Sequence, residues 1–130
     1  MGNDIEQPKG ELALRTLAMP ADANPAGDIF GGWLLAQMDI AGGISAKQRA
    51  RGRVATVAIN SMTFHKPVHV GDVLCCYTYI ERVGKTSIAI RIQAWVVRQY
   101  FSEDRIKVTE GEFTFVAIDE DRRPRPVREE

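Results

Sequence analysis

One long apolar segment, residues 31–51, limits what this chain can fold into. Its apolar residues recur at helical spacing, and its only charged groups are Asp39 and three basic residues near its end. Basic residues in the last turns suit a helix dipole, and Gly52 is a plausible stop. A helix that is apolar over its first four turns should be wrapped by other structure. The segment therefore predicts a long helix covered by the rest of the chain.

The remaining segments are predicted as strands, because they are rich in β-branched and aromatic residues with an alternating pattern. The expected strands are 11–19, 54–66, 73–82, 86–100 and 106–118. The order is one strand, the helix and then four strands, with polar turns between them. This order predicts an α+β fold in which the helix packs on a sheet.

Length and composition restrict the function classes. At 130 residues the chain is large enough for one domain with a real core. Its 17 basic and 17 acidic residues cancel, which gives no electrostatic case for nucleic-acid binding. No apolar run reaches the ~18 residues of a membrane span, and the first residues lack the pattern of a signal peptide. We expect a flexible leader at 1–10, a domain at 11–118 and a polar, arginine-rich tail at 119–130.

The two cysteines, Cys75 and Cys76, are adjacent and would face opposite sides of a strand. They predict neither a disulfide framework nor a metal site, and they favour reduced thiols in a cytoplasmic protein. His65 and His69 have no partners at metal-ligand spacing, so no metal site is expected.

Asp39 is unusual because it is the one carboxylate in the apolar helix, with no cationic neighbour one turn away. Burial of an ionised carboxylate is costly unless the charge is paired. Two interpretations remain open at this stage. Asp39 is either a catalytic carboxylate or a structural acid satisfied by a distant arginine or by backbone donors.

Several motifs together resemble one family. They are Asn-Pro-Ala-Gly-Asp-Ile-Phe-Gly-Gly-Trp at 24–33, Gln-Met-Asp at 37–39, Ala-Gly-Gly at 41–43, and the segments 53–59, 64–68, 70–73, 83–87 and 114–118. Over roughly residues 11–118 the chain resembles the hotdog-fold acyl-CoA thioesterases, most closely the YciA-like bacterial branch. The resemblance implies a hotdog fold, in which a five-stranded antiparallel sheet wraps one long apolar helix.

The family resemblance also implies an activity and an assembly. The chain would hydrolyse acyl-CoA to free acid and CoA without a metal or a separate cofactor, since CoA is part of the substrate. Two subunits would pair through their sheets with active sites at the interface, and the homodimers would assemble to a hexamer as a trimer of dimers. Asp39 would be the general base or nucleophile, and Asn24 of the partner subunit would orient the water or the carbonyl. Backbone N–H groups of Gly31 and Gly32 would bind the thioester oxygen.

Physical reasoning on the helix points to the same residues. A helix start has free N–H groups and a positive dipole end, which suit an oxyanion. Gly32 and Asp39 are seven residues apart, about 10 Å of axial rise, so one helix cannot present both to the same atom. This spacing predicts a site shared between two subunits. Gly42 and Gly43 indicate a close approach by the ligand, a partner helix or the sheet.

The Gly84-Lys85-Thr86-Ser87 turn combines backbone access, a cation and hydroxyl groups, which suit a phosphate of CoA. It could equally be an ordinary hairpin turn. Further CoA-binding candidates are Arg82, Arg53 and Lys66.

Two alternatives stay open beside the thioesterase. A non-catalytic acyl-CoA-binding or sensor protein could keep the fold and the turn, but it would not need a carboxylate in the helix. A hotdog enoyl-CoA hydratase has a signature that resembles Asp-x-Asn-Pro-x-His. Residues 22–26 begin that way, but Gly27 stands where the histidine would be, which counts against this alternative.

Overall fold

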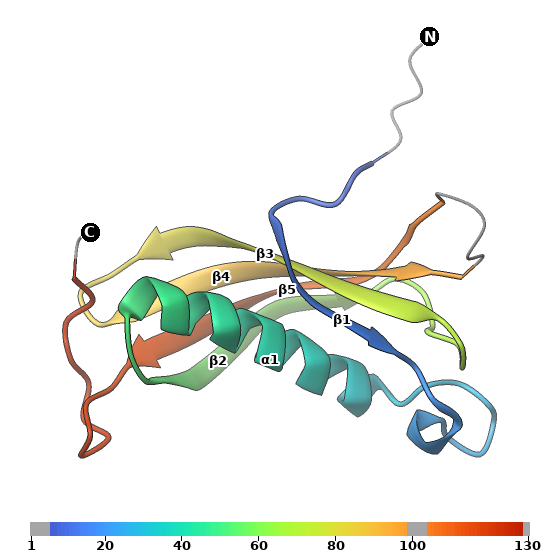
Figure 1. The fold of residues 1–130 in the computed structure, drawn as a ribbon, viewed down its shortest axis with the longest axis horizontal. Helices are drawn as coiled ribbons and strands as arrows, with labels where there is room; N and C mark the ends of the chain where they lie inside the picture. Colours follow the sequence, from blue (N-terminus) through green and yellow to red (C-terminus); the bar gives the residue numbers. More distant parts are fainter. Residues whose placement is uncertain (1–5, 99–103, 129–130) are drawn as a thin grey trace, which may run out of the picture.

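The computed structural model, which describes residues 6–98 and 104–128, has one helix lying across one face of a single antiparallel sheet (Figure 1). Its elements are β1 Glu11–Leu17, the short 3-10 helix η1 Pro20–Asp22, α1 Gly31–Ala50, β2 Val54–Phe64, β3 Val73–Val83, β4 Ser87–Val97 and β5 Ile106–Ala117. The strand order is β1-β3-β4-β5-β2, and every neighbouring pair is antiparallel. The predicted α+β class, with one long helix on a five-stranded antiparallel sheet, is confirmed.

The element ends differ from the predicted ones by a few residues. The helix ends at Ala50, because Arg51 adopts the left-handed conformation with φ 55° and the Gly52 N–H donates to the Lys47 carbonyl. A left-handed residue just after the last turn is a common way to end a helix. Here an arginine, and not the expected glycine, takes that conformation. The predicted strand 86–100 ends at Val97, and residues 99–100 lie outside the described part of the chain.

The core lies between α1 and the sheet. Buried helix residues Leu34, Met38 and Ala41 belong to one cluster with the inward side chains of β4 and β5. The closest approach is at Gly42, where an added Cβ would lie 2.6 Å from Ile92 Cδ1 and 2.8 Å from Phe115 Cζ. At Gly43 an added Cβ would meet only Phe115 Cε2, at 3.9 Å. The sequence left open whether the ligand, a partner helix or the sheet approaches these glycines. At Gly42 it is the sheet.

Within one chain the sheet covers only one side of α1. Ile40 and Ile44 keep 50% and 40% of their surface exposed on the helix. The edge strand β2 is also exposed at Val57, Ile59 and Phe64. Exposed apolar groups on the helix and on the open sheet edge are typical of a surface that another molecule covers.

The N-terminal segment meets the sheet face opposite α1 in residues 6–10. The Lys9 N–H donates to Gln93 Oε1 at 3.0 Å, and the Glu6 carboxylate pairs with Lys107 at 2.6 Å. In the described ranges, no helix is long and apolar enough to cross a membrane.

Candidate active site

Asp39 projects from α1 toward the edge strand β2. Its Oδ1 accepts a 2.6 Å hydrogen bond from the Thr56 hydroxyl, and the residue is half-buried. The sequence-based premise of a fully buried, unpaired carboxylate is therefore not met in the single chain. The partner is a neutral hydroxyl from a neighbouring strand, and no cation within the described ranges forms an ion pair with Asp39.

This geometry leaves Asp39 available for proton transfer. A carboxylate accepts at both oxygens, and the Thr56 hydroxyl occupies only Oδ1. The hydrogen bond fixes the orientation of the group while the second oxygen stays open to a water molecule. Such a group can act as a general base on a bound water.

The start of α1 offers two backbone donors that have no acceptor among the described residues, the N–H groups of Gly31 and Gly32. The Trp33 and Leu34 N–H groups donate to the Phe30 carbonyl at 3.1 and 3.3 Å. The N–H groups of Gly31 and Gly32 precede the first intrahelical bonds, and no acceptor for them lies within the described ranges. A Cβ at Gly32 would meet nothing within 4 Å, so the packing of this chain does not require glycine there. Both glycines are exposed, and the space beside them is open for a substrate.

Gly31 also lines a cavity of about 250 Å³ with Lys66, at the N-terminal end of the helix. The other lining residues include the apolar side chains of Ile29, Leu34, Phe64, Pro67 and Val68. A mainly apolar pocket beside free N–H groups suits the acyl side of a thioester. Lys66 therefore lies near the predicted oxyanion donors.

Asn24 has a clear structural role in the loop before the helix. Its Oδ1 accepts hydrogen bonds from the N–H groups of Ala26 and Asp28, at 2.9 and 3.1 Å. This is the turn-forming role common for asparagine. Only the side-chain NH₂ of Asn24 remains as a donor for a substrate or a water.

The predicted CoA-binding residues divide between the two ends of the molecule. Lys66 lies near the start of α1, whereas the β3–β4 turn 84–87 and Arg53 lie at the other end, beside the end of α1 (Figure 1). The helix between them is about 30 Å long, so Lys66 and Arg53 of one chain cannot hold the same phosphate. At the turn end, Arg82 forms an exposed ion pair with Glu112 at 3.2 Å.

The turn itself is a tight hairpin. The Gly84 N–H donates to the Ser87 carbonyl at 2.8 Å, and the Lys85 carbonyl accepts from the N–H of Val127 in the C-terminal segment. The side chain of Lys85 is exposed and carries no hydrogen bond or ion pair among the described residues. The turn thus has structural contacts and still presents a free cation.

Sequence reasoning missed two features of this surface. Thr56 was not singled out, although it falls in one of the family-like segments, because its contact with Asp39 depends on how β2 lies beside the helix. A ring of arginines around the end of α1 was also missed, except for Arg53, because its members are scattered along the chain.

Comparison with known proteins establishes the class to which this fold and site belong. The family model of the thioesterase superfamily matches residues 26–100, which include Asp39, and the chain belongs to this family. The acyl-CoA thioester hydrolase YciA of Salmonella typhimurium is 57% identical over 123 residues, which cover 92% of each chain.

Solved structures agree with this assignment. A hexameric thioesterase from Yersinia pestis is 54% identical with a TM-score of 0.90, over 95% of this chain and 100% of that one. A hexameric hotdog-fold thioesterase of Campylobacter jejuni is 38% identical with a TM-score of 0.85, over 92% and 91% of the two chains. The hotdog fold and the YciA-like family predicted from the sequence are confirmed.

Proposed function

We propose that this chain hydrolyses acyl-CoA thioesters to free acid and CoA, with Asp39 as the catalytic carboxylate. The observation that carries the proposal is the environment of Asp39. It is a half-buried carboxylate on the central helix, oriented by Thr56 at one oxygen and open at the other. Its position within the segment matched by the thioesterase family supports the assignment.

In the proposed reaction Asp39 takes a proton from water, and the water oxygen attacks the thioester carbonyl carbon. The carbonyl oxygen becomes an oxyanion, which the N–H groups of Gly31 and Gly32 stabilise. The carbon–sulfur bond then breaks, the acid is released, and the CoA sulfur receives the proton. Direct attack by the Asp39 carboxylate, followed by hydrolysis of the anhydride, is the covalent alternative with the same products.

The donors and the base come from different subunits in this proposal. Gly32 and Asp39 are about 10 Å apart along one helix, too far to act on one carbonyl. The open edge of β2 supplies unpaired backbone groups, and its exposed Val57 and Ile59 supply apolar surface for a second copy. A two-fold axis at this edge makes the two helices antiparallel, so that each helix start approaches the partner's carboxylate.

The side-chain amide of Asn24 then serves the site of the neighbouring subunit. Its oxygen is held by the loop, so the NH₂ group is directed by a rigid turn and can donate to the water or the carbonyl. The solved relatives are hexamers. We expect the same of this chain, with three such dimers in each assembly.

Thiol release from a panel of acyl-CoA lengths tests the activity, and mixed oligomers test the shared site. Asn24→Ala and Asp39→Asn subunits, each impaired alone, should regain part of the activity after they are unfolded and refolded together, because some interfaces then carry one intact site. Mixing each variant with itself is the control. An absence of any recovery, with mixed oligomers shown to form, would contradict a site divided between subunits.

A further inference from the structure

The loop between β2 and β3 ends in a buried carboxylate, Asp72, which has no part in the proposed reaction. Asp72 is 1% exposed, whereas Asp39 is half-buried. The Arg98 guanidinium, just after β4, holds the Asp72 carboxylate with two hydrogen bonds, from Nε to Oδ1 and from Nη2 to Oδ2, each at 3.0 Å. Burial of a carboxylate is costly unless the charge is paired, and a fork of two bonds fixes the orientation of both side chains.

The Asp72–Arg98 pair also holds the backbone of the loop 67–72. Arg98 Nη2 donates to the Pro67 carbonyl at 3.1 Å, and Asp72 Oδ2 accepts from the His69 N–H at 2.8 Å. The Asp72 N–H in turn donates to the His69 carbonyl at 3.0 Å. The pair therefore joins the end of β4 to both ends of this loop.

The loop 67–72 supports the segment that leads into α1. The Ile29 N–H donates to the Val68 carbonyl at 3.1 Å, and Asp28 forms an antiparallel β-bridge with His69. Ile29 and Val68 are both buried. Ile29 lies two residues before the first residue of the helix, where the proposed oxyanion donors lie. A continuous chain of hydrogen bonds thus leads from Arg98 to the start of α1.

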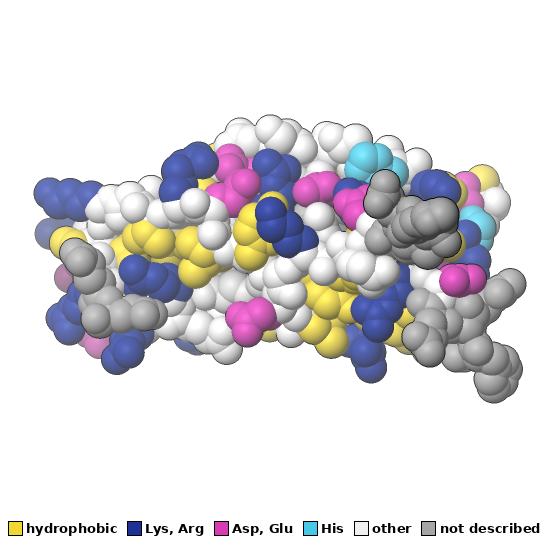
Figure 2. Space-filling model, turned by 90° about the horizontal axis from the view of Figure 1, so that it is seen from above, with side chains coloured by type: hydrophobic (Ala, Val, Ile, Leu, Met, Phe, Trp, Pro, Cys, Tyr) yellow, Lys and Arg dark blue, Asp and Glu magenta, His cyan; other side chains and the backbone are white. Residues whose placement is uncertain are grey.

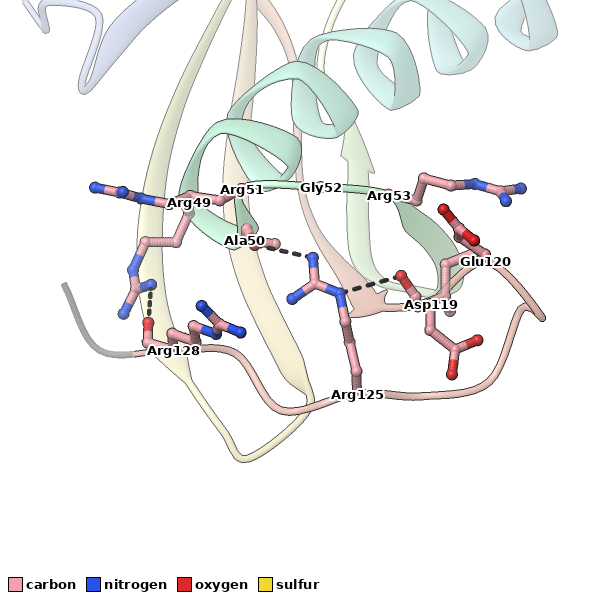
Figure 3. Close-up of a pocket in the computed structure, with 10 residues that line it drawn as sticks. Arg49, Ala50, Arg51, Gly52, Arg53, Asp119, Glu120, Arg125 and Arg128 are labelled. Carbon is pink, nitrogen blue, oxygen red and sulfur yellow. Dashed lines mark hydrogen bonds between the residues drawn. The ribbon is translucent and has the colours of Figure 1, made fainter.

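An arginine from a distant segment also holds the other end of α1. Arg125 donates from Nη2 to the Ala50 carbonyl at 2.9 Å and from Nε to the Ile118 carbonyl at 3.1 Å (Figure 3). These bonds tie the predicted polar tail directly to the last turn of the helix. At the start of the helix the tie is indirect, because Arg98 acts through a carboxylate and a loop. Only this second tie lies beside the proposed donors.

We infer that the Asp72–Arg98 pair positions the oxyanion donors Gly31 and Gly32, because it fixes the loop 67–72 on which the start of α1 rests. The two side chains are positioning residues, since they act through the loop. Preorganised donors stabilise a transition state only when they are held in place as the charge develops. The catalytic effect rests on the proposed function, whereas the mechanical link from the pair to the helix start does not.

Arg98→Met tests the inference, since the Arg98 side chain is 34% exposed and methionine keeps part of its apolar stem. Because this change leaves Asp72 unpaired, Arg98→Lys is the milder variant, which keeps the charge and loses the fork. The matched control is Arg91→Met, which breaks the ion pair between Arg91 and Glu81 at 3.5 Å. That pair lies on the sheet face turned away from α1, where Figure 2 shows acidic and basic side chains interspersed.

Hydrogen exchange on the intact oligomer measures the mechanical link. Peptides that cover residues 28–34 and 67–72 should exchange at least about threefold faster in Arg98→Met than in the wild type, and Arg98→Lys should lie between the two. Arg91→Met should exchange there as the wild type does. Unchanged exchange of both segments in the two Arg98 variants would overturn the inference. If Arg98→Met does not fold, Arg98→Lys decides by the same criterion.

Thiol release measures the catalytic effect. The kcat should fall about tenfold in Arg98→Met and about threefold in Arg98→Lys, with KM within about twofold of the wild type, because an interaction made in the transition state is weakened. Faster exchange at the helix start with wild-type kcat would overturn the positioning role, and so would an equal loss of kcat in Arg91→Met. A wild-type protein that releases no thiol from any acyl-CoA would overturn the proposed function, while the exchange data would still decide the mechanical link.

Discussion

Replacement of Gly42 by alanine tests how α1 is seated on the sheet. The added Cβ would lie 2.6 Å from Ile92 Cδ1 and 2.8 and 2.9 Å from two ring atoms of Phe115. Phe115 is 1% exposed and its ring stacks on Phe113 with centroids 6.4 Å apart, so it has little room to move. Overpacking of this kind costs about 1–3 kcal/mol, while alanine is preferred over glycine in a helix by about 1 kcal/mol. We expect a net loss of about 1 kcal/mol of unfolding free energy.

Gly43→Ala is the matched control, because it makes the same chemical change one residue further along the helix. Its Cβ would meet one ring atom at 3.9 Å, an ordinary contact, so the helix preference of alanine should raise the stability by up to about 1 kcal/mol. Urea unfolding of both variants at one fixed protein concentration gives the comparison, since subunit association adds to stability. The expected difference between them is about 2 kcal/mol. Equal stability of the two variants would refute the close packing inferred at Gly42.

Three further predictions concern the helix end, acid stability and the thiols. Arg125→Met should lower the unfolding free energy by about 1–2 kcal/mol because it removes the hydrogen bond to the last carbonyl of α1, whereas Arg123→Met, at an exposed position, should change little in the same urea titration. Burial raises the pKa of Glu110, but hydrogen bonds from Lys107 and Gln93 to its carboxylate lower the pKa by more. The pKa therefore lies below the ordinary 4.5. The ionised Glu110 therefore contributes its full stabilisation of the folded chain above pH 4.5, and this contribution is lost as the pH falls through the lowered pKa. The unfolding free energy of Glu110→Gln should consequently fall less steeply in acid than that of the wild type. Burial, together with the neighbouring Cys75, raises the pKa of Cys76 to about 12, so alkylation of Cys76 at about pH 8 should require prior unfolding. Rapid labelling of Cys76 in the native protein would contradict this.

Local sequence patterns predicted the type of every long element, because helices and strands place apolar residues with different periods. They could not give the strand order, since the pairing of β2 with β5 joins segments about fifty residues apart in the chain. The helix also ends one residue earlier than predicted. Arg51 takes the left-handed conformation that composition assigned to a glycine.

In the candidate site, too, local features could be predicted from the sequence and long-range contacts could not. Asp39 could be found from the sequence because a carboxylate is costly to bury in an apolar helix and is therefore unexpected there. The family motifs around it predicted its role. Its hydrogen bond to Thr56 could not be found, because the two residues meet only when the edge strand lies beside the helix. The order of residues 119–128 was also hidden, since one arginine that caps a helix looks like any other in a polar, arginine-rich segment.

The most direct test of the account is the acyl-CoA hydrolysis rate of Asp39→Asn. Asparagine has the same shape and can still accept the Thr56 hydrogen bond, so the fold, the oligomeric state and the affinity for coenzyme A should remain those of the wild type. Because asparagine cannot take the proton from water, kcat/KM measured by thiol release should fall at least about a hundredfold. A folded Asp39→Asn oligomer with near wild-type kcat/KM would contradict the central claim.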